Sequence, residues 1–559
     1  MIRKLISKIA MLIMVLKGKM SLRQLETASK TPVEDNNKLL LKIVRANRNT
    51  EFGKLHSFDK IRSVEDFRRN VPVSTYEDYA PYIERLKAGE GNLLSKAKVI
   101  GYSRTSGSSG VPKYIPATKA SLNAYIKYTW TRALALGAEE LKRQGERYRP
   151  GRGVFLSPAT NDCLPNGMLC SNIAEIGARQ FGFIYPYILT VPQKQLFDMH
   201  DGDYVYNIYR FALADEDVTF VFSVFFSINV SQIAYLKENW RMIVDDIEKG
   251  TINDSVELTP KLRKELTALI RPMPERAAYL RKQFEQGFDS TLFPRIWPKL
   301  AVMCGIGNAS FKPATDFVRS MCGDVPFDFS IYGASEGLVA ACYKLDCTDM
   351  QLLTDSCFYE FIPQDDANGE ILTIGQLEKG KKYEILITTQ SGLYRYRLKD
   401  VIEVMGFRNN CPLISFVYRK GQLFNVAGEK FSEEDARNSI EMLEKAHGVK
   451  IDHWIYYQDD SIAPNRYALI VEADADLGDC IDELEGYMGV CNKRYPSQRA
   501  KGFISRLVIK KQAPGTHAQW AQRCVAQGAS VAQVKPVHSL DNDAKREFFL
   551  SRIEEEARV

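Results

Sequence analysis

Several features that mark particular protein classes are missing from this 559-residue sequence. Its eleven cysteines form no Cys-x-x-Cys pair, and its six histidines are too dispersed along the chain to suggest a metal cluster. No internal repeat, low-complexity segment or block of basic residues is present. The net charge is only +6, from 75 basic and 69 acidic residues. These absences argue against a disulfide framework and against nucleic-acid binding, and they predict a cytoplasmic protein with reduced thiols.

The sequence also lacks an apolar run long enough to span a membrane. Residues 9–16 are apolar and follow a basic segment, as in a signal peptide. However, Lys17, Lys19 and Arg23 come directly after this run, and no small-residue cleavage pattern follows. We therefore expect no stable membrane span, but an amphipathic helix that packs on the body of the protein. Transient contact of this helix with a membrane surface is the alternative.

The composition is that of a chain that folds throughout, with 45% hydrophobic, 26% charged and 11% aromatic residues. Its length exceeds what one ordinary core can hold. Helical patterns and short apolar runs alternate along residues 1–418, which predicts a large α/β N-terminal lobe with mostly parallel sheets. The predicted helices cover residues 22–47, 120–136, 233–248 and 260–286. The predicted strands lie at residues 99–102, 154–156, 219–225, 300–305, 327–332, 371–374 and 383–388.

The pattern changes beyond residue 420 and predicts a smaller, mobile α+β lobe over residues 422–559. A helix at 432–446 begins with a capping box, because Ser432 and Asp435 stand three residues apart. Residues 419–421, Arg-Lys-Gly, lie between the two patterns and are the predicted hinge. The remaining expected elements of this lobe are strands at 453–458, 467–472 and 504–510 and a helix at 481–495.

The loop after the strand at 99–102 reads Thr105-Ser106-Gly107-Ser108-Ser109-Gly110 and is followed by Lys113. Glycine lets a backbone direct its N–H groups at an anion, hydroxyls add donors, and a lysine adds positive charge. The loop could therefore wrap a phosphate. It is not a Walker loop, because Gly-Lys-Ser/Thr is missing and Pro112 interrupts any helix that would follow. Such a run is more often a flexible connection than a nucleotide site.

Three later segments also carry polar groups that could contact a ligand. Residues 332–337, Tyr-Gly-Ala-Ser-Glu-Gly, follow a predicted strand and could lay their backbone on a flat ring and present Glu336. A plain strand-to-helix turn would use the same residues. Asp400, within 394–401, could accept both hydroxyls of a ribose or simply form a salt bridge. Lys535, in the glycine-led run 528–536, could reach a ligand or be an ordinary solvated charge.

The order of these segments resembles the adenylate-forming superfamily of acyl-CoA synthetases, firefly luciferase and nonribosomal peptide synthetase adenylation domains. Within it, the chain resembles most the auxin-responsive Gretchen Hagen family of acyl acid amido synthetases. The family sequence Tyr-Arg-Tyr-Arg-Leu-Gly-Asp-Val is matched at 394–401, with Lys399 in place of glycine. The resemblance extends from about residue 40 to residue 538. The other matching segments are 49–53, 71–78, 416–419, 428–430, 514–516 and the Gly-Ala-Ser-x-x-Gln-x-Lys run that ends at Lys535.

The resemblance implies an enzyme that uses ATP and Mg²⁺ to join a carboxylic acid to an amino acid. The acid would attack the α-phosphorus and release pyrophosphate, and the amine would then displace AMP. Glu336 is implied as a catalytic residue and as the Mg²⁺ ligand, and Lys430 and Lys535 are implied to reach the α-phosphate and the attacking carboxylate. Asp400 would hold the ribose and Tyr332 would lie against adenine. The other implied nucleotide-binding residues are Thr105, Ser106, Gly107, Ser108, Ser109, Lys113, Ser335 and Arg419.

The sequence departs from the family pattern at three places, of which the first is near the expected ribose contact and the last two are close to the expected acceptor side. Lys399 stands beside Asp400, His517 replaces an aromatic residue, and Pro536-Val537-His538 follows Lys535 where the family has Pro-Arg. A thiol acceptor such as coenzyme A, or a catalytically silent ligand-binding protein, therefore stays open beside the amino acid. We expect a monomer. The acyl pocket is expected between residues 120 and 340, with the aromatic stretches 181–187 and 220–226 as candidates, or as ordinary core.

Overall fold

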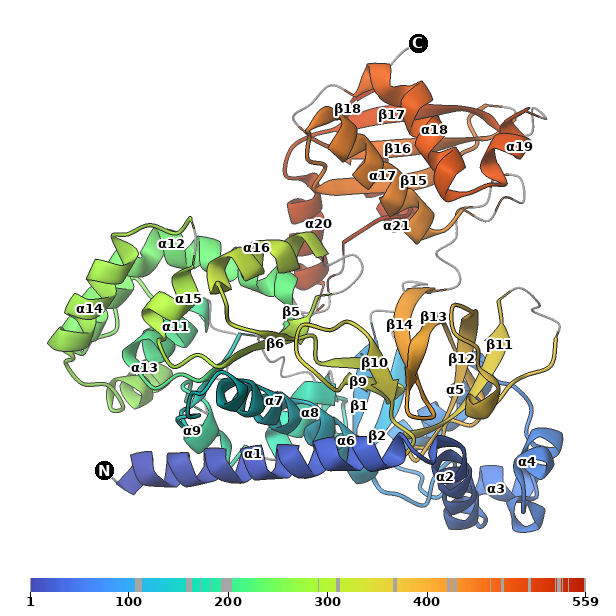
Figure 1. Ribbon diagram of the computed structural model, residues 1–559, viewed down its shortest axis with the longest axis horizontal. Coiled ribbons are helices and arrows are strands. Elements are labelled where there is room, and N and C mark those ends of the chain that lie inside the picture. Colours follow the sequence, from blue (N-terminus) through green and yellow to red (C-terminus); the bar gives the residue numbers. More distant parts are fainter. Residues whose placement is uncertain are drawn as a thin grey trace. The chain divides into compact units, whose positions relative to one another are not determined.

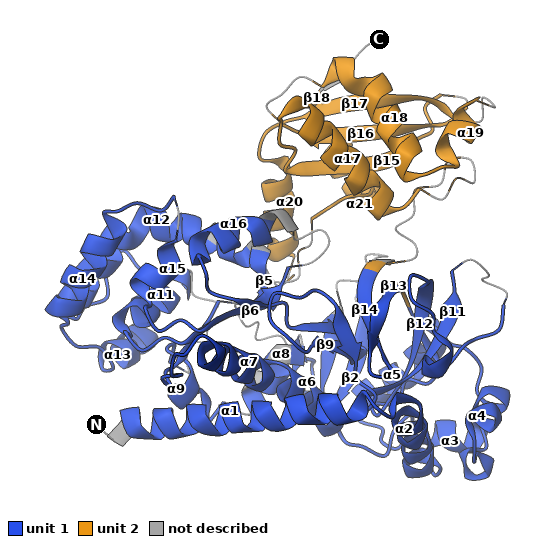
Figure 2. Ribbon diagram, in the orientation of Figure 1, with its two compact units in different colours: residues 1–105, 113–398, 402–416 blue, residues 106–112, 399–401, 417–559 orange. Residues whose placement is uncertain are grey.

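The structure is a computed structural model in which two units can be distinguished (Figure 2). Unit 1 comprises Met1–Thr105, Lys113–Leu398 and Ile402–Phe416, and unit 2 comprises Ser106–Pro112, Lys399–Val401 and Val417–Val559. The structure describes residues 2–105, 113–156, 163–171, 173–180, 182–192, 204–289, 291–307, 312–364, 369–419, 424, 426, 429, 431–462, 464–473, 477–500, 504–527, 529, 534, 536–540 and 542–556.

Unit 1 begins with helices, and its first predicted helix, 22–47, is two helices in the structure. Helix α1 (Ile2–Ala28) ends before a short turn, and Pro32 then opens α2 (Pro32–Asn47). Proline has no N–H to continue a helix but fits its first turn, which explains the break. Capping boxes at Ser63 and Thr75 start α4 and α5. These early helices are α3 (Glu51–Leu55), α4 (Val64–Asn70) and α5 (Tyr76–Lys87).

A four-stranded parallel sheet forms the α/β part of unit 1, with strand order β3-β5-β6-β7. Its strands are β3 (Gly153–Phe155), β5 (Phe220–Phe225), β6 (Val302–Ile306) and β7 (Phe327–Asp328). Each side chain of β3, β5 and β6 is at least half-buried, as expected for a parallel sheet covered by helices (Figure 1). The helices of this part are α6 (Lys119–Tyr128), α7 (Trp130–Arg143), α8 (Ile173–Gln180), α9 (Tyr185–Ile188), α11 (Tyr204–Ala214), α12 (Phe226–Lys249), α13 (Pro260–Thr267), α14 (Pro274–Phe284), α15 (Leu292–Ile296) and α16 (Lys312–Cys322).

A seven-stranded sheet of order β11-β12-β13-β14-β10-β9-β8 follows, together with a three-stranded sheet of order β2-β1-β4. Antiparallel pairing joins β11 to β12, β10 to β14, β10 to β9 and β8 to β9. In the smaller sheet β1 pairs antiparallel with β2 and parallel with β4. The strands are β1 (Val99–Thr105), β2 (Lys113–Thr118), β4 (Cys170–Ser171), β8 (Ile331–Ala334), β9 (Gly337–Cys342), β10 (Met350–Leu352), β11 (Cys357–Pro363), β12 (Lys382–Thr389), β13 (Tyr396–Arg408) and β14 (Cys411–Arg419).

Two strand predictions in this region, at 327–332 and 371–374, are wrong. The single strand expected at 327–332 is two strands, β7 and β8, which belong to different sheets. Ser330 between them has φ 65°, a left-handed conformation that redirects the chain. The strand expected at 371–374 is absent from the described residues there, where only Leu372 forms an isolated bridge to Phe361.

Unit 2 is an α+β structure built on a four-stranded sheet of order β15-β16-β17-β18. The helix predicted at 432–446 is confirmed as α17 (Glu433–His447), and its Ser432–Asp435 capping box is present. The two larger apolar clusters among the described residues of this unit pack around Phe431 and Leu484 and around Ile455 and Phe549. The predicted α/β class, with a parallel sheet and helices, is confirmed. The remaining elements of unit 2 are β15 (His453–Asp459), β16 (Arg466–Glu472), β17 (Ser505–Gln512), β18 (Ile553–Glu556), α18 (Ile481–Cys491), α19 (Tyr495–Ala500), α20 (Thr516–Ala526) and α21 (Asp543–Leu550).

Candidate active site

Glu336 lies in the two-residue turn of a β-hairpin. Strands β8 and β9 pair antiparallel, with Ala334 opposite Gly337, so Ser335 and Glu336 form the turn between them. The strand-to-helix turn considered from the sequence is therefore wrong. Both turn residues are half-buried, and the Tyr396 hydroxyl donates a hydrogen bond to Glu336 Oε1 at 3.3 Å. The hairpin thus presents a carboxylate that is positioned yet partly accessible.

Close contacts on both sides of this turn explain its glycines. A Cβ at Gly333 would lie 3.1 Å from the Tyr125 ring, and one at Gly337 would lie 2.8 Å from Cys357 Sγ. The Tyr125 hydroxyl donates to the Ala334 carbonyl at 2.5 Å. Burial, with smaller contributions from Cys357 and Glu336, raises the pKa of Tyr125 above its usual range, so its hydroxyl remains a donor. The backbone of the hairpin is therefore held from α6.

A fully buried ion pair fixes the chain just before the hairpin. Arg132 of α7 and Asp328 of β7 each have 0% exposed side chains, and two guanidinium N–H groups donate to the carboxylate at 2.9 and 2.8 Å. The same guanidinium donates to the carbonyls of Ser330, Cys342 and Tyr128 at 2.8, 2.7 and 2.7 Å. All five arginine N–H donors are thereby used. Sequence reasoning missed this pair, because an arginine inside a helical pattern looks like a surface residue.

Two aromatic rings flank the hairpin. Tyr332 of β8 lies with its ring centroid 5.8 Å from that of Phe416 of β14, and their planes are inclined by 59°. Tyr332 is half-buried and Phe416 is exposed. The sequence pointed to Tyr332 but assigned no role to Phe416, although it opens the matching segment 416–419. A partly accessible aromatic pair of this kind offers a surface for a flat ring.

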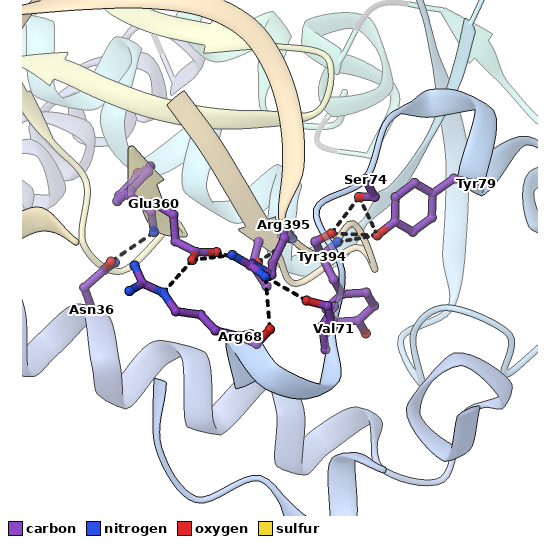
Figure 3. A network of polar contacts seen from close by, with 10 residues as sticks. Asn36, Arg68, Val71, Ser74, Tyr79, Glu360, Tyr394 and Arg395 are labelled. Carbon is purple, nitrogen blue, oxygen red and sulfur yellow. Dashed lines mark hydrogen bonds and ion pairs between the residues drawn. The ribbon is translucent and has the colours of Figure 1, made fainter. Parts of the chain in front are cut away.

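The early segment 71–78 packs against the start of β13 (Figure 3). Ser74 N–H donates to the Arg395 carbonyl at 3.1 Å, and Arg397 N–H donates to the Ser74 carbonyl at 2.9 Å. The Tyr79 hydroxyl donates to the Tyr394 carbonyl at 2.8 Å and accepts the Tyr394 N–H at 2.9 Å. Two segments that stand more than 300 residues apart are thus joined by backbone bonds and by the Tyr79 hydroxyl. Their role is to hold β13, which carries Tyr396 to Glu336.

The side chain of Arg395 completes this support (Figure 3). Its guanidinium donates to Glu360 Oε2 at 2.9 Å and to the Val71 carbonyl at 2.8 Å, and Arg68 also donates to Glu360 at 2.8 Å. The Glu360 side chain is 1% exposed. Phe52, in the segment 49–53, stacks on the Tyr394 ring at 4.7 Å. The segments that carry the family resemblance early in the chain are therefore structural rather than chemical.

In unit 2, Asp400 and Arg419 form an ion pair. Arg419 Nε donates to Asp400 Oδ1 at 2.5 Å, the Asp400 side chain is 3% exposed and that of Arg419 is 39% exposed. Lys399, which replaces the family glycine, has φ 62°. This left-handed conformation is one that glycine adopts without strain, which explains the glycine of the family pattern. The pair brings together two residues that the sequence assigned to the nucleotide site.

The residue before Lys430 is a buried carboxylate that sequence reasoning left without a role. The Glu429 side chain is 1% exposed, and it accepts the Val426 N–H at 2.6 Å and the hydroxyl of Tyr467. Burial and the neighbouring Glu429 raise the pKa of Tyr467 above its usual range. Glu429 therefore links the Val426 backbone to Tyr467 of β16. Lys430 itself lies outside the described residues.

The other predicted site residues fall at the margins of the described chain. Thr105 ends β1 and pairs with Lys113, the first residue of β2, whose Nζ lies 5.2 Å from the centroid of the Tyr76 ring. After Lys535, the His538 carbonyl accepts the Tyr456 N–H at 3.1 Å, which fixes that segment along β15. Outside the described residues lie Ser106, Gly107, Ser108, Ser109 and Lys535, together with Lys420 and Gly421 of the expected hinge.

This chain is similar to known proteins along most of its length. Family models match the GH3 family N-terminal domain at residues 21–327, its central domain at 350–419 and its C-terminal domain at 434–544. Indole-3-acetic acid-amido synthetase GH3.8 of Oryza sativa subsp. indica is 26% identical over 538 residues, which cover 89% of this chain and 86% of that protein. The 4-substituted benzoates-glutamate ligase GH3.12 of Arabidopsis thaliana is 25% identical over 543 residues, covering 91% and 92%.

A solved structure, described as GH3.15 acyl acid amido synthetase, shares the fold with a TM-score of 0.81 and 22% identity, covering 96% of each chain. The family predicted from the sequence is therefore confirmed along nearly its whole predicted extent. The three family models, the similar amido synthetase sequences and the shared fold lead to one conclusion. This chain belongs to the GH3 family.

Proposed function

We propose that this protein is an ATP-dependent acyl acid–amino acid ligase. A carboxylate oxygen of the acid attacks the α-phosphorus of ATP, the bond to the leaving pyrophosphate breaks, and an acyl-adenylate forms. The amine of an amino acid then attacks the acyl carbon, loses a proton and displaces AMP. The observation that carries this proposal is the β8–β9 hairpin, which holds Glu336 half-buried beside a pair of aromatic rings.

Glu336 is our candidate for a Mg²⁺ ligand. Mg²⁺ is usually held by one or two carboxylates together with substrate phosphates rather than by a protein cage. Among the described residues no group of three or more His, Cys, Asp or Glu side chains could hold a metal, so a single carboxylate at an accessible turn fits this mode. The ion, when bound, would neutralise charge on the phosphates. The Tyr396 hydroxyl, at 3.3 Å, orients the carboxylate for that task.

Two further sets of side chains would bind the nucleotide, one at the adenine ring and one at the ribose. We assign Tyr332 and Phe416 to the adenine ring, because a flat base stacks on accessible aromatic faces. We assign Asp400 to the ribose hydroxyls, since hydrogen bonds to an ionised acceptor are about twice as strong as neutral ones. Arg419 Nε donates a hydrogen bond to Asp400 Oδ1 and so holds this carboxylate in one direction. Ser335, which precedes Glu336 in the hairpin turn, is our remaining candidate for a contact with the nucleotide.

The negative charge on the phosphates of ATP would be stabilised by a further set of residues. We propose Thr105, Ser106, Gly107, Ser108, Ser109 and Lys113 for the β- and γ-phosphates, and Lys430 and Lys535 for the α-phosphate and the attacking carboxylate. Preorganised donors of this type typically contribute about 10²–10³ in rate each. Movement at 419–421 between lobes 1–418 and 422–559 would bring one lysine in for each half-reaction. We also propose that the protein is a cytoplasmic monomer, in keeping with its eleven free cysteines.

The proposal is tested by incubating the protein with ATP, Mg²⁺ and a panel of aryl, alicyclic and aliphatic acids. One series receives the twenty amino acids and a second series receives coenzyme A. Mass spectrometry is expected to find an acyl-amino acid amide and AMP in the first series only. A thioester in the second series alone would replace the proposed acceptor. No pyrophosphate release with any acid would identify a catalytically silent protein.

A further inference from the structure

Helix α1 (Ile2–Ala28) carries apolar side chains on two opposite faces. One face packs on unit 1, where Met11, Val15 and Leu25 are buried. Gly18 lies so close to α7 that a Cβ there would stand 1.8 Å from the Thr131 carbonyl oxygen. Ser7 also donates a hydrogen bond to the Tyr187 carbonyl at 2.5 Å. The prediction that this helix packs on the body of the protein is thus confirmed. The prediction that it is amphipathic is wrong, because the face that this packing turns outward is apolar too.

The outward face is a continuous apolar stripe. At 100° per residue, Leu5, Ile9, Leu12 and Leu16 lie on the side opposite Met11. Figure 1 shows α1 as one straight helix along the edge of unit 1, with α7 beside it. A surface helix normally exposes polar residues here, so this stripe is unusual. The stripe consists of Leu5, Ile6, Ile9, Leu12, Ile13, Leu16 and Met20, with exposures between 41% and 60%.

The charges beside the stripe are of one sign. The first 25 residues contain six basic residues and no aspartate or glutamate, and the first acid is Glu26, which pairs with Arg408. Lys8 and Lys19 lie along one edge of the stripe and Lys17 along the other. Long lysine side chains can direct their ammonium groups sideways while the apolar face is buried. The basic residues of this segment are Arg3, Lys4, Lys8, Lys17, Lys19 and Arg23.

We propose that α1 binds the surface of an anionic lipid bilayer and lies in its headgroup region, parallel to the membrane plane. An apolar face flanked by lysines is the pattern of interfacial helices, and its charge is complementary to anionic lipid. None of the helices in the described part of the chain is long and apolar enough to cross a membrane. Asp217, whose pKa Lys4 and Lys8 help to lower, is paired with Lys299. The stripe therefore holds the protein on the surface and does not span the bilayer.

The experiment measures flotation of the full-length protein with vesicles of phosphatidylcholine containing 30% phosphatidylglycerol, and with vesicles of phosphatidylcholine alone. We expect binding to the anionic vesicles that weakens strongly in 0.5 M NaCl. The variant Ile9→Ser/Leu12→Ser/Leu16→Ser should lower the partition coefficient at least about 100-fold, because three large apolar side chains are lost from the contact. Lys8→Glu/Lys17→Glu/Lys19→Glu should lower it about 100-fold or more, since each basic residue near the surface contributes about fivefold.

Matched controls change the same residue types elsewhere on the surface. The control for the apolar variant is Leu55→Ser/Leu269→Ser/Val490→Ser, which removes three exposed apolar side chains. This control and the charge control named next are expected to float like the wild type. The control for charge is Lys42→Glu/Lys282→Glu/Lys379→Glu. All four variants should keep the wild-type unfolding midpoint and ligase activity in solution.

Three results would overturn the proposal. The wild type could fail to float with anionic vesicles at millimolar lipid, or the control variants could lose flotation as fully as the α1 variants. In the third, light scattering would find a dimer that the Ile9→Ser/Leu12→Ser/Leu16→Ser variant dissociates, without any vesicle binding by the wild type. That result would mean that a second copy of the chain covers the stripe. Because vesicle binding needs no catalysis, a failure here leaves the proposed ligase activity untouched, and the reverse also holds.

Discussion

Two aspartate–arginine pairs in this protein differ in a way that separates structure from chemistry. In unit 1, both side chains of the Arg132–Asp328 pair are 0% exposed, and all five guanidinium donors are used within the protein. In unit 2, Asp400 is buried, but its partner Arg419 keeps 39% of its side chain exposed. A fully satisfied pair has nothing to offer a ligand. A pair that opens to solvent on one side can exchange part of its contacts for a substrate.

The difference in exposure predicts a structural role for the Arg132–Asp328 pair and a ligand-binding role for Asp400. Arg132 and Asp328 hold the chain where it leaves the parallel sheet and enters the Glu336 hairpin, so their loss should affect folding first. Asp400 should instead affect nucleotide binding first.

The largest expected effect is on stability. Arg132→Met leaves Asp328 as a buried charge without its partner, which typically costs about 3–5 kcal/mol. Urea unfolding followed by tryptophan fluorescence measures this loss. The control is Arg143→Met, because Arg143 pairs with Glu140 on the surface and such pairs contribute about 0–1 kcal/mol. Equal losses in the two variants would remove the distinction between the pairs.

The second expected effect is on nucleotide binding. Asp400→Asn should lower kcat/KM for ATP about 10- to 100-fold, because hydrogen bonds to charged groups contribute about 1.5–3 kcal/mol. Wild-type enzyme should discriminate against 2′-deoxy-ATP, and the variant should discriminate much less. Asp459→Asn is the control, because Asp459 pairs with Arg466 elsewhere in unit 2. If the Asp400 variant keeps the wild-type preference for ATP, the ribose assignment fails.

The third effect depends on pH and concerns unit 2. Burial, together with His453 and His538, lowers the pKa of His517 to about 3, and its ring stacks on that of His453 at 4.4 Å. Because the unfolded histidine binds its proton near pH 6.5 and the folded one does not, stability is full above pH 6.5 and falls toward pH 3. His517→Phe should abolish this loss of stability at low pH. The loss lowers the free energy of unfolding of the wild type by about 2 kcal/mol at pH 5 and by nothing at pH 7.5.

Thermal unfolding of both proteins across this pH range tests the claim. The wild type and the His517→Phe variant should diverge only below pH 6.5, with the variant the more stable. Parallel curves at all pH values would show that His517 is not held neutral. His447→Phe is a suitable control, because His447 is partly exposed and pairs with Glu483.

The smallest effect concerns the residue beside Asp400. Lys399 has φ 62°, which costs a non-glycine residue about 1–2 kcal/mol, whereas glycine loses about 0.5–1 kcal/mol of chain entropy on folding. Lys399→Gly should therefore stabilise the protein by about 0.5–1 kcal/mol without lowering kcat/KM for ATP. Lys399→Ala keeps the strain and should stabilise nothing. A destabilised glycine variant would contradict the left-handed conformation.

Local chemistry accounts for what could be predicted from the sequence. The capping box at Ser432 and the apolar runs at 154–156 and 219–225 identified a helix and two parallel strands, because each signal lies within a few residues. Ser330 could not be recognised as the switch between two sheets, since its φ is imposed by packing at both ends. Nor could Arg132 be paired with Asp328, because 196 residues separate them. Such choices follow from tertiary contacts alone.

The residues of the candidate site also divide into those that the sequence could identify and those that it could not. Tyr332, Glu336, Asp400 and Arg419 could be named because their motif order resembles one family. Their supports could not be named. Tyr396, Phe416 and Glu429 lie within or beside the same motifs, yet their roles emerge only from contacts between distant strands. Positioning residues have no local signature, because any residue that fills the space and satisfies the hydrogen bond would serve.

The most direct test of the central claim is acid-dependent exchange of labelled pyrophosphate into ATP by wild type and Glu336→Gln. The variant keeps the size of the turn side chain and should keep the wild-type unfolding midpoint. If Glu336 acts at the phosphates, exchange falls about 10²–10³-fold, as for the loss of other electrostatic groups. Exchange at the wild-type rate by a folded Glu336→Gln enzyme would contradict the account.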